Sequence, residues 1–453
     1  MTVQERRAVA GRVALHPARA VTLAFGALIA LGALLLRLPF THRRGVPVDL
    51  PAALFTATSA VTVTGLSRLD VAATWNRGGL VVLLVLVQLG GLGVMTLASL
   101  VALALSNRLG IRARSLAGGE VGAVAPGELR RVLRAVAVCS VVVEVCSTAI
   151  LGVWLWLRHG EAPAEALWWG AFHSVMAFNN AGFGLASDNL VAYVGDPVVN
   201  VVISAGVVLG GLGFPVIAEL WRTRGRRPGR WSLHTKLTVT VSGALIVAGT
   251  CAVLLLEWAN PGTLGPLGVL DKLQAAMFQG VSPRTAGFNT VDIGALTEET
   301  WVVMVLLMFI GSGAASTGGG IRVTTFAVLV LACWAELRGE PSVTVFGRRL
   351  PSAVVRQSLT VTVLSIGLVG LATTVLLAVS PVPLDRTLFE AVSAFGTVGL
   401  STGVTASFDW RGHGVLMLLM FLGRVGPATL GAALVLRRRA RLYDYPEDRP
   451  LVG

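Results

Sequence analysis

Charged residues are scarce in this sequence. Only 13% of the 453 residues are Asp, Glu, Lys or Arg, whereas 54% are hydrophobic, and the mean hydropathy is +0.75. A soluble protein needs more charge than this, so the composition excludes that class and indicates a bundle of membrane helices.

The sequence also has few cysteines, and none of them lies at a metal-binding spacing. The four cysteines lie inside apolar runs, at Cys139, Cys146, Cys251 and Cys333. We interpret them as packing residues of the protein core, which excludes both a disulfide framework and a cysteine metal site.

The apolar segments also lack the motifs of intramembrane enzymes. The apolar segments contain no HExxH, no GxSxG and no paired aspartates, and His173 and His234 have no evident partners in the sequence. We therefore expect a protein that is not an enzyme and has no cofactor in this chain.

Eight stretches of the sequence are long and apolar enough to cross a bilayer. A spanning helix needs about 20 mostly apolar residues to cross a hydrocarbon core about 30 Å thick. The first stretch is too long for a cleaved signal, so we expect it to remain as a helix. The stretches are 18–37, 78–105, 131–157, 198–221, 235–258, 299–337, 354–379 and 413–436.

Basic residues are concentrated between pairs of these stretches. The net charge of +13 is nearly all arginine, and positive-inside topology explains it better than a nucleic-acid partner. We expect a multi-pass protein of a bacterial plasma membrane with both termini cytoplasmic. The basic loops and tail hold Arg108, Arg112, Arg114, Arg130, Arg131, Arg222, Arg224, Arg226, Arg227, Arg230, Lys236, Arg338, Arg348, Arg349, Arg356, Arg437, Arg438, Arg439 and Arg441.

A short turn around one glycine occurs four times, each time between the two spans of a pair. Intervals of 117, 105 and 112 residues separate the four glycines, so the repeat is close to regular. The copies are Thr62-Val63-Thr64-Gly65-Leu66, Asn179-Asn180-Ala181-Gly182-Phe183, Arg284-Thr285-Ala286-Gly287-Phe288 and Gly396-Thr397-Val398-Gly399-Leu400.

The repeat predicts an all-α integral membrane protein of four fused units. Each unit consists of a helix, a short pore helix, a glycine turn and a second helix, so that eight transmembrane helices surround a central pore with pseudo-fourfold symmetry. The predicted units are residues 1–106, 107–225, 226–340 and 341–453.

The turns have the chemistry of a monovalent-cation site. A re-entrant backbone is tolerated at membrane depth only inside protein or beside a watery cavity, and a ring of carbonyls replaces the hydration shell of such a cation. Glycine permits the necessary dihedral angles, and threonine hydroxyls could add oxygens. Three acids that follow turns, Asp70, Asp188 and Asp292, would concentrate cations at the outer mouth.

The sixth stretch is interrupted by glycines. The apolar piece before them, Trp301 to Ile310, spans only about 15 Å, so the break falls inside the membrane. A packing kink and a mobile gate below the turns are the two interpretations. The candidate gate residues are Gly311, Gly313, Ser316, Thr317, Gly318, Gly319 and Gly320, within the segment 311–320.

Arg424 and Glu144 are charged residues in the middle of predicted spans. Arg424 lies near the centre of the last span, where a charge costs at least about 2.5 kcal/mol, so it should face a polar interior. It is either an electrostatic barrier to cations or a partner of the glycine loop. For Glu144, in the third span, a structural hydrogen bond is favoured over a role in transport.

The turns TVTGL, NNAGF, RTAGF and GTVGL, with FNTVD after the third, closely resemble the pore loops of the Trk/Ktr/HKT family of potassium transporters. The resemblance covers essentially the whole chain and is closer to the Ktr membrane subunit than to the longer Trk type. It implies that the four turns bind K⁺ through backbone carbonyls, and that Gly65 favours potassium over sodium. It also implies that the glycine loop and Arg424 form the gate.

The same resemblance implies partners. The tail Tyr445 to Gly453 resembles a Ktr ending that pairs two membrane subunits, so a homodimer is expected in the lipid bilayer. A KtrA-like cytosolic ring of regulatory proteins would carry the nucleotide, and Na⁺ would act as an activator or coupling ion. The alternative function is a Na⁺- or H⁺-coupled secondary transporter of another small solute, which inverted repeats and midplane acids would support.

Overall fold

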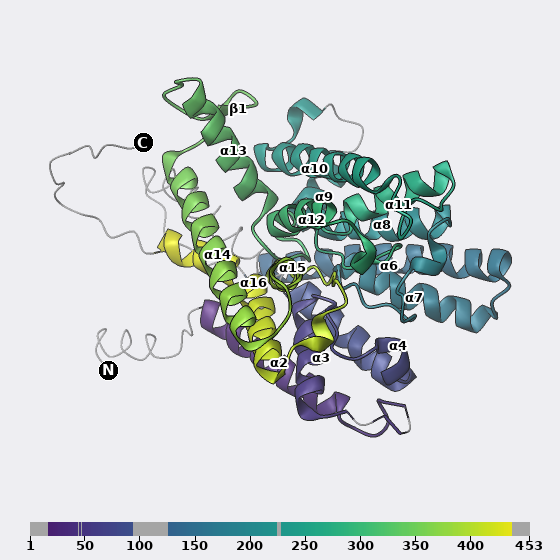
Figure 1. Ribbon diagram of the computed structural model, residues 1–453. Coiled ribbons are helices and arrows are strands. Elements are labelled where there is room, and N and C mark those ends of the chain that lie inside the picture. Colours follow the sequence, from purple (N-terminus) through teal and green to yellow (C-terminus); the bar gives the residue numbers. More distant parts are fainter. Residues whose placement is uncertain (1–16, 44, 47, 94–125, 224–227, 437–453) are drawn as a thin grey trace, which may run out of the picture.

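The computed structural model describes residues 17–436 except 44, 47, 94–125 and 224–227 (Figure 1). Within these ranges the chain is helical apart from one isolated bridge between His42 and Trp75 and one hairpin, in which strand β1 (Thr344–Val345) pairs with strand β2 (Arg348–Arg349). The sequences N-terminal to residue 17 and C-terminal to residue 436, including the predicted dimerisation tail, lie outside the described residues.

Four half-helices, each shortly before a glycine turn, lie among the other helices of the bundle. These other helices are α2 (Pro17–Leu36), the helix Arg77–Gly93, α6 (Pro126–His159), α8 (Pro197–Leu212), α10 (Leu233–Glu257), α12 (Glu298–Ile310), α13 (Val323–Leu337), α14 (Ser352–Val379) and α16 (Trp410–Leu436). The half-helices are α3 (Leu50–Thr62), α7 (Pro163–Asn179), α11 (Val269–Val281) and α15 (Leu384–Gly396). Short elements are α4 (Val71–Thr74), α9 (Phe214–Arg222), η1 (Val191–Tyr193), η2 (Pro228–Arg230), η3 (Ile293–Ala295) and η4 (Thr405–Ser407).

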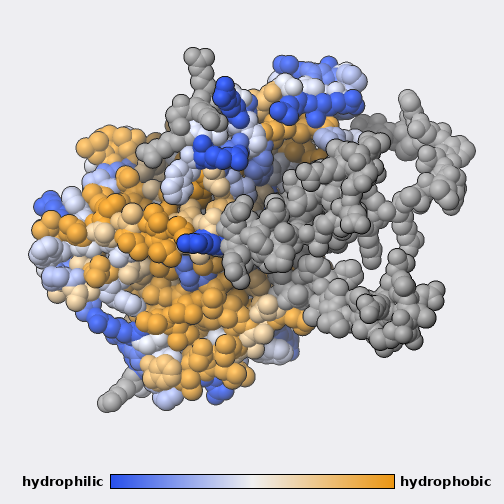
Figure 2. All heavy atoms as spheres, turned by 180° about the vertical axis from the view of Figure 1, so that it is seen from behind, coloured by the Kyte–Doolittle hydropathy of each residue, from blue (hydrophilic) through white to orange (hydrophobic). Residues whose placement is uncertain are grey.

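The outer surface of this bundle is apolar. Among the described residues, three helices are long and apolar enough to cross a membrane alone, within α6, α10 and α14, and the bent pair of α8 and α9 would make a fourth. Figure 2 shows broad connected areas of hydrophobic residues on one face. Large apolar side chains such as Leu255, at 81% exposure, and Leu337, at 77%, have no protein cover, so this surface suits lipid.

The cysteines lie largely on that outer surface, and their prediction as core residues was wrong. Cys146, Cys251 and Cys333 are exposed, and Cys139 is only partly buried. An apolar run in a membrane helix is surrounded by protein on one side and lipid on the other, so hydropathy alone does not separate the two faces.

The fourth predicted stretch, 198–221, is not one helix. Helix α8 ends at Gly213, and α9 leaves it at an angle of 100°. Gly213 has φ +90° and ψ 147°, a conformation that disfavours residues with a Cβ, and Pro215 lacks the N–H that would continue the helix. We refer to this junction, Leu212 to Pro215, as the α8–α9 corner.

A glycine on the second helix of three units lets that helix touch its half-helix. A methyl group on Gly90 would overlap the carbonyl oxygen of Val61. Methyl groups on Gly210 and Gly423 would likewise overlap the carbonyl oxygens of Phe178 and Phe395, respectively. Each of these carbonyls belongs to the residue before a predicted turn. Close backbone approach through glycine is how membrane helices pack without a hydrophobic driving force.

Replacing Gly90 by alanine should lower the melting temperature of the detergent-solubilised protein. The added methyl group has backbone rather than a movable side chain opposite it, so overpacking should cost about 1–3 kcal/mol. Gly93→Ala on the same helix is the control, because its nearest neighbour is the Phe25 ring at 3.8 Å. Equal melting temperatures for both variants and the parent would contradict this packing.

Candidate functional site

The four turns, distant in the sequence, form a closed ring at the centre of the bundle. A Cβ added to Gly65 would lie 2.8 Å from the amide nitrogen of Gly182, and one added to Gly182 would lie 2.6 Å from the Cα of Gly287. Additions to Gly287 and Gly399 would lie 3.1 Å from the Cα atoms of Gly399 and Gly65. The turns therefore follow one another around the ring in chain order, and the last meets the first.

The backbone of each turn begins in an uncommon conformation. The second residue of every turn has positive φ: Val63 at 58°, Asn180 at 61°, Thr285 at 83° and Thr397 at 49°. The left-handed region costs a residue with a Cβ about 1–2 kcal/mol, and it is rarest for β-branched residues such as valine. Such strain persists only where the surroundings hold it, and it gathers at functional sites.

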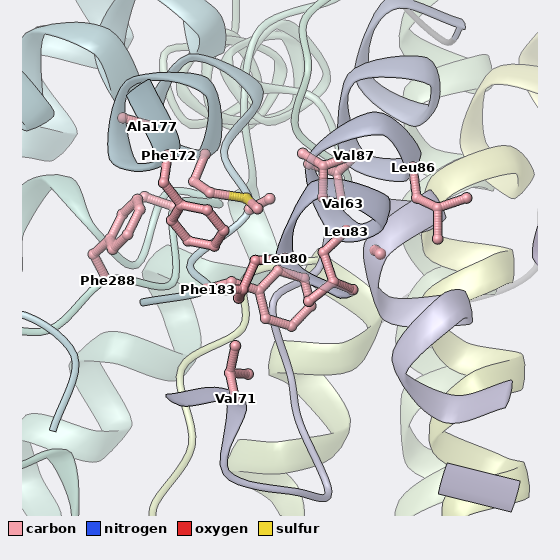
Figure 3. Close-up of a cluster of buried hydrophobic side chains, with 14 of the residues drawn as sticks. Val63, Val71, Leu80, Leu83, Leu86, Val87, Phe172, Ala177, Phe183 and Phe288 are labelled. Atoms are coloured by element: carbon pink, nitrogen blue, oxygen red, sulfur yellow. The ribbon is translucent and has the colours of Figure 1, made fainter. Parts of the chain in front are cut away.

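Buried apolar side chains hold the turns in place. The fifth residue of each turn is at most 1% exposed, at Leu66, Phe183, Phe288 and Leu400. Figure 3 shows the cluster around two of them, in which Phe183 lies among Leu80 and Leu83 while Phe288 lies beside Phe172. Each turn is thus fixed to the core directly after its glycine.

Backbone oxygens line the contacts between turns. The carbonyl oxygens of Thr64, Gly287 and Val398 each lie against the glycine of the adjacent turn, where a methyl group would overlap them. The carbonyl of Gly182 instead accepts a hydrogen bond of 2.8 Å from Asn189 Nδ2. This arrangement concentrates carbonyl dipoles at one place, which is the chemistry that replaces water around a monovalent cation.

The threonine hydroxyls of the turns differ in their hydrogen bonding. Thr62 Oγ1 donates to Thr58 O at 2.7 Å and lies 2.8 Å from Thr64 Oγ1, so both hydroxyls are engaged within the first unit. The hydroxyl of Thr285 lies 3.0 Å from the Asn180 amide of the adjacent turn. The buried hydroxyl of Thr397 has no protein hydrogen-bond partner.

Arg284, the first residue of the third turn, directs its side chain away from the ring. Its Nη1 and Nη2 atoms donate to the carbonyl and hydroxyl oxygens of Ser242 on α10, each at 3.0 Å. A guanidinium inside the ring would repel any cation, and this anchor keeps the charge in the helix bundle instead.

Glu144 lies behind the second turn and bonds to it. Its Oε1 accepts from Ser140 Oγ at 2.6 Å, from Gln88 Nε2 at 3.0 Å and from Asn179 Nδ2 at 3.4 Å. Asn179 Nδ2 also donates to Gln88 Oε1 at 2.6 Å. Glu144 therefore makes structural hydrogen bonds, the role favoured by the sequence analysis. Gln88 was missed by that analysis, and it joins the first unit to the second turn.

The glycine loop, residues 311–320, lies against the ring. The Thr317 hydroxyl donates to Phe178 O at 3.2 Å, at the end of the second half-helix. A Cβ on Gly318 or Gly319 would overlap the hydroxyl oxygens of Thr285 and Thr397, respectively. The loop thus contacts the end of the second half-helix together with the third and fourth turns.

Two arginines hold the loop in this position. Arg424, fully buried on α16, donates from Nη1 to Thr317 O and from Nη2 to Gly90 O at 3.3 Å. Arg322 donates to Gly313 O at 3.2 Å and to Gly318 O at 2.5 Å, so it closes the loop on itself. Sequence reasoning missed Arg322, although a charge directly after the glycine run was the available signal.

The α8–α9 corner also binds the loop. A continuous helix would use the carbonyl of Gly210 for the amide of residue 214, and Pro215 has no N–H for the carbonyl of Gly211, so the corner leaves both carbonyls open. Thr317 N donates to Gly210 O at 3.2 Å and Gly313 N to Gly211 O at 2.8 Å. In return Phe214 N donates to Ala315 O at 3.2 Å. The run Gly210-Gly211-Leu212-Gly213-Phe214-Pro215 was the sequence signal for this second break.

The acids after the turns, Asp70, Asp188 and Asp292, are exposed, and Asp70 and Asp292 cap short elements. Asp70 accepts from the amides of Ala72 and Ala73 at the start of α4, and Asp292 caps η3. A third cap, Asp196 at the start of α8, also accepts from Trp154 and from His159 at 2.7 Å. Partial burial raises the pKa of the Asp196 carboxyl, but its backbone and side-chain hydrogen bonds lower that pKa more, so it lies below the ordinary value.

Fold and site together define a multi-pass helical membrane protein built around a ring of four buried backbone turns. A family model described as a cation transport protein, TrkH, matches residues 20–439. The chain belongs to the TrkH family of cation transport proteins.

Its relatives are similar over their full lengths. The chain is 38% identical to the Ktr system potassium uptake protein B of Bacillus subtilis, with all of both chains covered. It is 37% identical to the protein of the same name from Vibrio alginolyticus, covering 96% of this chain and 94% of that one. It is 32% identical to the potassium/sodium uptake protein NtpJ of Enterococcus hirae, again over all of both chains.

The fold has a solved counterpart. The crystal structure of the potassium transporter TrkH from Vibrio parahaemolyticus aligns with a TM-score of 0.72, covering 94% of this chain and 86% of that one. Sequence identity in that alignment is 18%, so this likeness concerns the fold alone.

Replacing Glu144 by alanine should destabilise the protein, because the donors of Ser140, Gln88 and Asn179 lose their shared acceptor. Loss of one such buried partner costs about 1–3 kcal/mol. Glu144→Gln keeps an oxygen in place and should restore most of the melting temperature and of the uptake per molecule. A glutamine variant as impaired as the alanine variant would show that the negative charge itself matters.

Proposed function

We propose that this chain is the ion-translocating membrane subunit of a potassium uptake system. The observation that carries the proposal is the ring of four turns, in which each glycine contacts the next. Relatives named as potassium uptake proteins, similar over their whole length, support potassium as the transported ion.

In this proposal the chain forms four units around one pore, with boundaries near residues 106, 225 and 340. The first four residues of each turn form the filter, and the backbone carbonyls coordinate K⁺. The half-helices end at the ring, so the partial negative charge of their C-termini favours a cation there. K⁺ is the substrate, and no cofactor is needed in this chain.

The loop 311–320 and Arg424 form the gate, and the described conformation is closed. The loop contacts the third and fourth turns and the half-helix before the second turn, and Arg424 bonds both to the loop and to Gly90 of the first unit. A loop that merely packed against a kink would not need contacts with several units.

A proton- or sodium-coupled carrier of another solute fits the site less well. Such a carrier needs a midplane acid that exchanges a proton or an ion with the pathway. Glu144 is engaged by three side-chain donors behind the second turn. Glu390, the acid behind the fourth turn, accepts from Ser401, Thr402 and Thr405.

The remaining expectations belong to the same proposal. The chain lies in a bacterial plasma membrane with both termini cytoplasmic, forms a homodimer and binds a cytosolic ring of nucleotide-binding regulatory subunits. Sodium acts as an activator or coupling ion. One full-length relative is named a potassium/sodium uptake protein, so both ions must be measured in any test of selectivity.

Gly65→Ser should reduce potassium selectivity. A serine Cβ would lie 2.8 Å from the Gly182 amide nitrogen, and the required widening would weaken K⁺ coordination relative to Na⁺. A loss of about 1.4 kcal/mol in discrimination lowers the K⁺/Na⁺ ratio about tenfold. The ratio is measured as uptake of each ion by reconstituted protein.

The matched control is Gly403→Ser. Gly403 also has positive φ, at 86°, but has open space around its Cβ position, so it reproduces the backbone strain without the clash. An unchanged ratio in a well-folded Gly65→Ser protein would remove Gly65 from the filter.

Arg424→Ala should raise the maximal K⁺ uptake of the chain alone. Its removal releases Thr317 and Gly90 and deletes a positive charge near the pathway. Like charges about 8 Å apart repel by about 2 kcal/mol at an effective dielectric near 20, which corresponds to at most about a 30-fold change in rate. Selectivity should be retained, because the turns lie above this residue.

Uptake must be normalised to purified, reconstituted protein for this test. If the variant is stable and transports at the parental rate, Arg424 is not part of the gate. If it loses stability without gaining flux, Arg424 is a structural tie between α16 and the loop.

A further inference from the structure

A cleft lies at the end of the molecule away from the ring of turns. Its walls are η2 with the start of α10 on one side and the hairpin of β1 and β2 on the other, and its volume is about 560 Å³. Figure 1 shows the hairpin beyond the end of α13, at the margin of the bundle. We refer to this feature as the hairpin cleft. Nothing in the proposed transport mechanism uses it.

The hairpin cleft is lined by positive charge. Arg230, Lys236 and Arg348 contribute to its walls, and none of the described residues that line it carries a carboxylate. Glu219 is nearby but does not line the cleft. Its carboxylate accepts hydrogen bonds from the Ser232 amide and from the hydroxyls of Ser232 and Thr235. The three basic side chains therefore have no acidic partner among the residues that line the cleft.

Two aromatic side chains also line the hairpin cleft. Trp231 lines one wall, and Phe346 lines the other at the tip of the hairpin. Phe346 and Gly347 both have positive φ, 49° and 71°, as a two-residue hairpin turn requires, and Phe346 remains 51% exposed. The Lys236 ammonium lies 5.7 Å from the centre of the Phe346 ring.

The cleft adjoins the lipid-facing surface. The last turns of α13, directly before the hairpin, expose Trp334 at 55% and Leu337 at 77%. Basic residues with aromatic residues at the edge of an apolar belt are typical of the headgroup level of a membrane. A ligand in the cleft can thus place a phosphate among the basic residues and apolar chains along α13.

We infer that the hairpin cleft binds the phosphate of an anionic phospholipid headgroup. Arginine donors match phosphate oxygens in geometry, and lysine adds a compact charge. A soluble polyphosphate would offer the same phosphate chemistry but nothing for the exposed apolar surface beside the cleft. The lipid is therefore the ligand that uses both features.

The test uses the purified full-length chain and a variant with Arg230→Gln, Lys236→Gln and Arg348→Gln. Binding of phosphatidylglycerol is counted by native mass spectrometry and followed as thermal stabilisation over phosphatidylcholine. Each basic residue contributes about fivefold to the affinity for an anionic surface, so the triple variant should bind about 100-fold more weakly. Arg349→Gln is the control, because Arg349 neighbours Arg348 on the strand but does not line the cleft.

The outcomes are distinct. Selective loss of phosphatidylglycerol binding in the triple variant, with Arg349→Gln unchanged, supports the site. Equal binding by all three proteins overturns it, as does equal loss in the control. If inorganic pyrophosphate stabilises the parent and phosphatidylglycerol does not, the ligand is a soluble phosphate and the lipid assignment fails. If neither ligand stabilises the parent, the cleft is not a phosphate site, and an acidic protein partner becomes the hypothesis to test.

Discussion

Hydrocarbon offers no hydrogen bonds to a polypeptide, and this constraint governs the structure. Four turns, a glycine loop and a helix corner all interrupt helical pairing in the bundle, so their amides and carbonyls must find partners in protein or enclosed water. The loop and the corner satisfy each other, at Gly211 with Gly313 and at Phe214 with Ala315. In the described part of the chain, the ring of turns brings several carbonyl oxygens together, and it is there that we propose cation binding.

The buried arginines follow from the same constraint. Arg424 donates to two carbonyl oxygens, whereas Arg284 and Arg322 each donate to carbonyl and hydroxyl oxygens, those of Ser242 and those of the glycine loop. Dipoles stabilise a guanidinium without cancelling its field, so positive potential remains at the base of the ring. The carboxylates of Glu144 and Glu390 lie behind turns and are bonded to side-chain or backbone donors there. Positively charged side chains thus lie at the base of the ring, whereas the carboxylates lie behind the turns.

The sequence predicted features that depend on local pattern and missed those that depend on three-dimensional pairing. Span length and the regular spacing of Gly65 and its equivalents were visible in the chain, because membrane thickness and repetition act on contiguous residues. The hydrogen bond from Asn179 to Gln88 joins residues that are far apart in the sequence, and no pattern in either segment indicates it. The sequence also did not indicate which face of an apolar helix meets lipid. Cys251, predicted as a core residue, is exposed. Whether the turns act as a filter is decided by function and stays a prediction.

The α8–α9 corner has a further consequence. If the loop withdraws, the carbonyls of Gly210 and Gly211 and the amide of Phe214 lose their partners together, and each unpaired buried group costs about 1–3 kcal/mol. Pro215 prevents the helix from reclaiming the carbonyl of Gly211 by straightening. The amide of Phe214 can return to the carbonyl of Gly210, but the carbonyl of Gly211 is then left to water. In the proposed gate, withdrawal of the loop therefore requires that water enter the space it leaves, so opening would depend on water activity.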